Sequence, residues 1–132
     1  MALSLDSEAY REKVAGGIRH LAFCMKVYAW QHAEGRLFLH EHPHGAWSWK
    51  EPCVVDVLEL EGVMAVVGDQ CMFGQMVEGQ FARKRTRWMT NCLAIAKELA
   101  IPCDGYHEHI NLFGGRAKQT EKCSPRLVAA IL

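Results

Sequence analysis

A long stripe of apolar residues near the start of the chain restricts the folds that this sequence can adopt. Beginning after Asp6, which can serve as a helix N-cap, apolar side chains recur at spacings of three and four residues. Their positions are Tyr10, Val14, Ile18, Leu21, Met25, Tyr28 and Ala29. The period predicts the longest helix of the chain, and Gly35 lies where a left-handed residue would end it. Any fold of this sequence must therefore cover one face of a long helix.

Shorter apolar runs and helix-like segments alternate along the rest of the chain. The runs typical of strands, which are compact and contain β-branched or aromatic residues, are 36–40, 63–67, 86–90 and 109–113. The segments predicted to be helical run from Ser48, which forms a capping box with Glu51, to about Gly62, from Asn91 to about Ala100, and onward from Ser124. Residues 71–82 contain glycines and no clear period, which predicts a loop.

This alternation predicts an α/β fold. Helices that cross over a sheet join parallel strands, so we expect a mostly parallel, truncated Rossmann-like sheet with helices on both faces. The 132 residues suit one compact domain, and residues 1–132 are predicted to form it. In open parallel sheets, ligands bind outside the carboxyl ends of the strands. Because Glu41 and Asp69 each follow a predicted strand, we expect a candidate site between them.

The balanced charge of the chain limits the partners that it can hold. Lys and Arg together number 15, as do Asp and Glu, which excludes a general positive field for nucleic acid. The run from Arg83 to Arg87 still carries four positive charges in five residues, so it indicates either a local phosphate contact or a solvated loop flank. No apolar stretch reaches the roughly 18 residues of a membrane span, and no secretion leader is evident. We therefore expect an intracellular protein without membrane contact, whose six cysteines are reduced thiols.

Several short motifs along the chain resemble a known family in their order. "LHEHP", "GDQCMFG", "RKRTRWMTN" and "SPRLVAAIL" are similar to elements in the C-terminal half of cytosine-C5 DNA methyltransferases. The order of "GRLFLHEHP", "SW", "GDQC", "MTN" and "GGRA" more closely resembles a methyltransferase-like region of copia-type retrotransposon polyproteins. The resemblance covers about residues 10–132 and implies the same Rossmann-like fold.

The resemblance implies roles for five residues. Glu41 would contact a cytosine ring and hold a proton on its ring nitrogen, as a vestigial proton donor. Arg83, Lys84, Thr86 and Asn91 would lie on the side of the domain that faces nucleic acid.

Two parts of the family's chemistry are missing at their expected places. These are the Gly-rich methyl-donor loop and the Pro-Cys nucleophile, and methyl transfer needs both together with the acid. We therefore expect a noncatalytic remnant of mobile-element origin that contacts DNA or RNA and uses no cofactor. The alternative is half of an active DNA methyltransferase, completed by an upstream segment or a partner chain, which would bind S-adenosylmethionine. A half-sheet would also leave a strand edge unpaired, which favours self-association.

A cysteine and two histidines late in the chain favour a different class, a small zinc-stabilised interaction module. Cys103, His107 and His109 place three metal-ligand side chains within seven residues. The candidates for the fourth ligand of a tetrahedral zinc ion are Cys71, Cys92 and His42. The alternative is that the histidines lie on the surface beside a buried cysteine.

The segment "LHEHPHGAWSW" holds the remaining candidate residues. On a strand, His40 and His42 point to one face and Glu41 to the other, which argues against all three binding one ion. Trp47 and Trp49 follow, and they indicate either packing at the edge of the core or a surface on which a base can stack.

Overall fold

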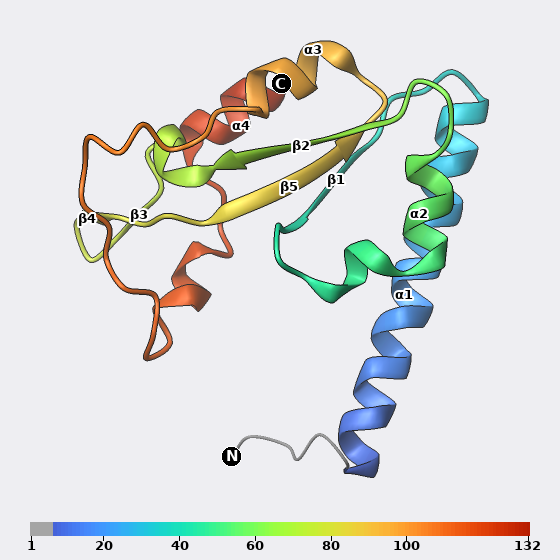
Figure 1. The fold of residues 1–132 in the computed structure, drawn as a ribbon, viewed down its shortest axis with the longest axis horizontal. Coiled ribbons are helices and arrows are strands. Elements are labelled where there is room, and N and C mark those ends of the chain that lie inside the picture. Colours follow the sequence, from blue (N-terminus) through green and yellow to red (C-terminus); the bar gives the residue numbers. More distant parts are fainter. Residues whose placement is uncertain (1–6) are drawn as a thin grey trace.

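Figure 1 shows the computed structural model, which describes residues 7–132. The α-helices are α1 (Glu8–Ala33), α2 (Pro52–Leu58), α3 (Leu93–Leu99) and α4 (Pro125–Ile131). The strands are β1 (Leu39–Pro43), β2 (Met64–Asp69), β3 (Met76–Val77), β4 (Gln80–Phe81) and β5 (Arg85–Thr90). The short 3-10 helices are η1 (Trp47–Lys50), η2 (Gln70–Phe73) and η3 (Arg116–Thr120). No helix within residues 7–132 combines the length and the apolar character needed to cross a membrane.

β5 lies in the middle of a three-stranded sheet. The strand order is β1-β5-β2, and both outer strands run antiparallel to β5. In this register Trp88 lies opposite Glu41 on one side and opposite Val66 on the other. A separate antiparallel hairpin pairs β3 with β4. The prediction of a mostly parallel, Rossmann-like sheet is therefore wrong, and the fold is α/β with small antiparallel sheets.

The error lies in the connection that leads into β5. β1 and β2 do run in the same direction, and the segment between them contains α2, as a crossover requires. Residues 70–84 contain only η2 and the β3–β4 hairpin, which cannot cross a sheet. The chain therefore turns back, and β5 enters between the first two strands in the opposite direction. The alternation of apolar segments in the sequence contains no sign of this insertion.

Capping residues set the ends of the first and last helices. The Ser7 side chain accepts a hydrogen bond from the first turn of α1 and acts as its N-cap. Asp6, the predicted N-cap, lies outside the described residues. Gly35 has a φ of 70° just beyond α1, so its predicted left-handed conformation is confirmed. The predicted N-cap of α4 is confirmed as well, because Ser124 accepts a hydrogen bond from that helix.

The helix predicted to start at Ser48 begins later and ends earlier. Residues 47–50 form η1, and Glu51 is extended and shows no side-chain capping bond. The predicted capping box is therefore wrong. α2 starts at Pro52, which suits a first helical position because it has no N–H to leave unpaired, and it ends at Leu58.

Two predicted strands also differ from the structure. β1 starts at Leu39 and ends at Pro43, so both of its ends are shifted by three residues toward the C-terminus relative to the predicted run of 36–40. Residues 109–113 form no strand, and the only backbone bond described there that reaches the hairpin is from Ile110 N–H to the carbonyl of Phe81, 2.8 Å long. An apolar run without a neighbouring strand to pair with does not become a strand.

Successive residues of β5 point into two different cores, because side chains alternate across a strand. Met89 packs with buried residues of α1, α2 and the segments around β1, namely Leu21, Met25, Phe38, Trp49, Val54 and Val57. Trp88 packs on the other face with Phe73, Leu99 and Leu127, next to α3 and α4. α2 therefore covers part of the apolar stripe of α1, and the two helices lie side by side in Figure 1.

Gly68 is the point at which the chain after α3 returns against β2. A Cβ atom at this position would lie 2.1 Å from the carbonyl oxygen of Leu99, so only glycine fits here. The next residue, Asp69, donates its N–H to the carbonyl of Ile101 at 2.9 Å. These contacts hold the segment after α3 against the end of β2, and they place Cys103 beside Asp69.

Candidate functional site

Four metal-ligand side chains converge at the end of β2. Cys71, in η2, meets Cys103, His107 and His109 from the segment after α3, and their ligand atoms all lie within 4.8 Å of one another. The Cys103 Sγ atom is 3.6 Å from His107 Nε2 and 3.5 Å from His109 Nε2. A zinc ion with bonds of its usual length in a tetrahedral site separates its ligand atoms by about 3.5 Å. The spacing therefore suits one metal ion held by two sulfur and two nitrogen atoms.

Asp69 fixes the backbone on which this cluster is built. Its buried carboxylate accepts two hydrogen bonds of 3.0 Å from Arg85 and one of 2.8 Å from the backbone N–H of Cys103. Burial acts to raise the pKa of Asp69, but the hydrogen bonds from Arg85 and Cys103 and the nearby Arg83 outweigh it and lower that pKa to about 2. Asp69 is thus ionised, and it holds Cys103 in place through the main chain.

The surroundings of the cluster disfavour negative charge on its buried cysteine. Burial, followed by the neighbouring Cys103, raises the pKa of Cys71 to about 12. Burial also lowers the pKa of His109, with a further contribution from His107, so its imidazole stays neutral near pH 7. A neutral imidazole can bind a metal directly, and a bound cation is what would allow a buried thiol to lose its proton.

Neighbouring side chains orient the two histidines. His107 Nδ1 lies 3.6 Å from a carboxylate oxygen of Asp104, which leaves Nε2 to face the cluster. The ring of Phe81 covers His107, with the ring centroids 4.5 Å apart. These contacts hold the ligand atoms toward one point.

The predicted metal-binding residues are brought together in the structure. Cys103, His107 and His109 lie in one cluster, and Cys71 is the fourth member. The other two candidates for the fourth position lie elsewhere: Cys92 is the N-cap of α3, and His42 is on β1. The sequence spacing could identify the three late residues but could not choose among the distant candidates, because that choice depends on the turn after β2.

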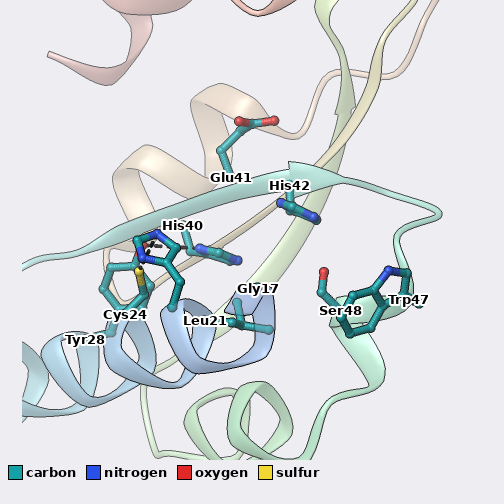
Figure 2. A pocket seen from close by; sticks show the side chains of 10 residues that line it. Gly17, Leu21, Cys24, Tyr28, His40, Glu41, His42, Trp47 and Ser48 are labelled. Atoms are coloured by element: carbon teal, nitrogen blue, oxygen red, sulfur yellow. Dashed lines mark hydrogen bonds between the residues drawn. The ribbon is translucent and has the colours of Figure 1, made fainter. Parts of the chain in front are cut away.

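Glu41 is not part of this cluster. It projects from the face of β1 opposite His40 and His42, as predicted from the alternation (Figure 2). Its carboxylate is 4.0 Å from the Lys84 ammonium group and is partly exposed to solvent. Glu41 lies in the middle of β1 and Asp69 is the last residue of β2, and these two strands end at the same edge of the sheet, but β5 lies between them. The expected site between neighbouring parallel strands is therefore wrong.

The basic run makes most of its contacts within the protein. Arg83 and Arg85 both approach Asp69, although their side chains remain 43% and 45% exposed. Lys84 donates a hydrogen bond to the carbonyl of Thr120 at 3.3 Å. Thr86 is buried and bonded to Gln70 at 2.9 Å. Of the predicted nucleic-acid-facing residues in this run, Arg83 thus has the most accessible charge, and contact with nucleic acid stays a prediction.

Asn91, the last residue with a predicted nucleic-acid role, contacts two backbone groups and one side chain. Its Oδ1 accepts a 3.0 Å hydrogen bond from Phe38 N–H, and its Nδ2 donates to the carbonyl of Arg36 at 2.8 Å. Nδ2 also lies 3.0 Å from His32 Nδ1. The side chain therefore fixes the path from α1 into β1, and the helix predicted to start at Asn91 has Cys92 as its N-cap instead.

Asn91→Ala is expected to destabilise the protein, because it leaves the backbone N–H of Phe38 and the carbonyl of Arg36 without their partner. The loss in free energy of unfolding should be about 1–3 kcal/mol. Urea denaturation of both proteins at pH 7 measures it. An unchanged midpoint would show that water replaces the amide at no cost.

A pocket of about 430 Å³ lies on the other face of β1, between that strand, α1 and η1. His40 and His42 point into it, and Tyr28, Cys24 and Trp47 stand around it (Figure 2). The Tyr28 hydroxyl and His40 Nδ1 are 3.2 Å apart and share a hydrogen bond. Burial, followed by the nearby His42, lowers the pKa of His40 to about 4, so this imidazole is neutral at pH 7.

The low pKa of His40 predicts a loss of stability in mild acid. The unfolded chain takes up a proton at this histidine near pH 6.5 but the folded chain only near pH 4, so its contribution is complete above pH 6.5 and disappears as the pH falls toward 4. Between pH 7 and pH 4.5 the expected loss is about 2 kcal/mol. Urea unfolding of wild type and His40→Gln at pH 7 and pH 4.5 isolates it, since any other acid effect is common to both proteins. A constant difference between the two proteins would contradict the prediction.

Comparisons with protein-family models, curated proteins and solved structures found no match to this chain.

Proposed function

We propose that this protein is a small interaction module stabilised by a structural zinc ion bound to Cys71, Cys103, His107 and His109. The observation that carries the proposal is the convergence of these four ligand atoms within 4.8 Å, although they come from segments more than 30 residues apart. Side chains of this type rarely gather by chance around one point.

The type of ligand favours zinc. Two thiolates and two imidazoles are the ligand set of many structural zinc sites, whereas Mg²⁺ and Ca²⁺ prefer oxygen. Four protein ligands also fill a tetrahedral site and leave no position for a substrate or a catalytic water. The ion would therefore serve the fold rather than a reaction.

The position of the cluster explains what the ion would stabilise. Residues 101–115 contain no helix or strand, so few backbone hydrogen bonds hold this segment to the rest of the molecule. Three of the four ligands lie in it, and the fourth, Cys71, lies in η2, which follows β2 directly. A zinc ion would fasten this segment to the end of the sheet, as metal ions do in small domains with limited cores.

Metal analysis tests the proposal. Protein expressed without a His tag and purified without chelator is expected to contain close to one equivalent of zinc. Replacement by Co²⁺ should give the visible absorption bands of a tetrahedral ion with sulfur ligands. Less than about a tenth of an equivalent, with no uptake of added zinc, would contradict the proposal.

Descent from a mobile element and contact with DNA or RNA stay predictions. The antiparallel sheet differs from the parallel sheet that the methyltransferase resemblance implies, so the fold adds no support to that origin. Fluorescence anisotropy with single-stranded and double-stranded oligonucleotides tests the contact directly. Substituting Arg83 should weaken it, since that guanidinium is 43% exposed.

A further inference from the structure

We propose that the pocket between α1 and β1 binds a neutral, planar heterocycle of nucleobase size. The pocket is remote in sequence from the metal cluster: its walls come from α1, β1 and η1, whereas the cluster comes from η2 and the segment after α3. The proposal does not depend on whether zinc is bound.

The first argument is the shape of the pocket. Its volume of about 430 Å³ lies within the range of small-molecule sites, and residues of three elements line it, while the remaining side is open to solvent. Figure 2 shows α1 forming one wall, the strand carrying His40 and His42 forming the opposite wall, and Trp47 at one end. A pocket of this volume can hold a ligand of nucleobase size.

The second argument is the aromatic character of the walls. The rings of His40 and His42 are nearly parallel, with an angle of 8° and a centroid distance of 6.0 Å. The ring of Tyr28 meets His40 edge-on, at 60°. Trp47 stands at the edge of the pocket and is 53% exposed, whereas Trp49 is buried in the core and bonded to the carbonyl of Pro43. Packing therefore explains Trp49, but it leaves the face of Trp47 free for a planar ligand.

The third argument is an unused polar atom on a buried side chain. His40 is only 9% exposed, and its Nδ1 is occupied by the Tyr28 hydroxyl. Within residues 7–132, its Nε2 has no hydrogen-bond partner in the protein, and the ring points into the pocket (Figure 2). Because Nε2 is not fully enclosed by protein atoms, it is open to the pocket, where a ring nitrogen, carbonyl or amino group of a heterocycle can bond to it in place of water.

The fourth argument is the charge of the surroundings, which favours a neutral ligand. Glu41 is one of the residues that line the pocket, but its carboxylate projects to the other face of β1 (Figure 2). Arg87 lies opposite His42 in the sheet, but its guanidinium is stacked over the Trp49 ring at 4.7 Å. The Cys24 thiol is 3.6 Å from His20 Nε2. No described carboxylate or guanidinium therefore faces a ligand here, and an ionised ligand would lose hydration without gaining a counter-charge.

Titration with nucleosides tests the proposal. The full chain, saturated with zinc, is titrated with adenosine, cytidine, uridine and thymidine while the ring signals of His40 and Trp47 are followed by NMR. At least one nucleoside is expected to give saturable shifts, with a dissociation constant on the order of 1 mM. Trp47→Ala should weaken that binding about tenfold, as loss of one base–aromatic stack does.

Trp30→Ala is the matched control, because Trp30 is a tryptophan of similar exposure, 55%, that contacts Arg36 and not the pocket. It should bind the nucleoside as wild type does.

Nicotinamide and nicotinate form a second matched pair. They are similar in size, but nicotinamide is neutral and nicotinate is an anion, and nicotinamide should bind several times more tightly. A short single-stranded oligothymidylate that binds more tightly than thymidine would identify the natural source as a nucleic-acid strand, and equal binding would identify a free nucleoside.

Three results would overturn the proposal. The first is the absence of saturable shifts with all four nucleosides, and the second is unchanged binding in Trp47→Ala. The third is equal or tighter binding of nicotinate, which would exclude a site for neutral ligands. Because the Trp47 side chain is largely exposed, folding of the Trp47→Ala variant is not at risk.

Discussion

Gly68→Ala is expected to prevent this protein from folding. The added methyl group would lie 2.1 Å from the carbonyl oxygen of Leu99 and 2.9 Å from the ring of Trp88. The first of these atoms belongs to the backbone and cannot move away as a flexible side chain can. The cost should exceed the about 1–3 kcal/mol typical of an overpacked core. Circular dichroism and urea denaturation of the purified variant would measure the loss.

The same substitution at a second glycine provides the control. Gly17 lies inside α1, and a Cβ atom there would have no neighbour within 4 Å. Gly17→Ala should therefore raise stability by about 1 kcal/mol, through the better helix propensity of alanine. If Gly68→Ala were as stable as wild type, the close return of the chain against β2 would be wrong. The position of Cys103 in the cluster would then be wrong too.

Cys103→Ser is expected to abolish zinc binding and to lower stability. Cys103 contacts both histidines of the cluster, so no arrangement of the remaining three ligands restores a closed tetrahedral site. If free zinc stands at a thousand times its dissociation constant, the wild-type protein gains about 4 kcal/mol from binding, and the variant should lose this amount. Thermal unfolding with and without added zinc measures the difference.

Cys123→Ser is the matched control for this experiment. Cys123 is an exposed free cysteine and is not part of the cluster. The variant should keep one equivalent of zinc and the wild-type midpoint. Chelation of zinc from the wild-type protein should lower its midpoint to that of Cys103→Ser. A wild-type midpoint that does not respond to the chelator would mean that the four side chains meet without binding a structural ion.

The parts of the fold that depend on local signals could be predicted from the sequence. The stripe of α1, the left-handed Gly35 and the cap of α4 at Ser124 each follow from residues close together in the chain, and each is confirmed. The order and direction of the strands could not be predicted, since they depend on which distant segments pair. Nothing near residues 85–90 indicates that this strand lies between two earlier ones.

The candidate site likewise has a part that the sequence predicts and a part that it does not. The spacing of Cys103, His107 and His109 identifies three ligands, because they lie within one short segment. The role of Asp69 was missed, since it acts through the backbone N–H of a residue 34 positions away. The sequence also could not show that Asn91 is engaged in the connection to β1, because its partners lie more than 50 residues earlier. In a sequence, a polar residue that binds a ligand cannot be distinguished from one that hydrogen-bonds to the main chain.

The central position of β5 has a consequence for synthesis on the ribosome. β1 and β2 have no strand between them until residues 85–90 have left the exit tunnel, and both cores need a side chain from that late strand. A nascent chain that ends before this point can form α1, but it cannot close either core. Co-translational folding should therefore be delayed until β5 inserts, which allows the core around Met89 to close, whereas the core around Trp88 also needs Leu99 and Leu127 from later in the chain.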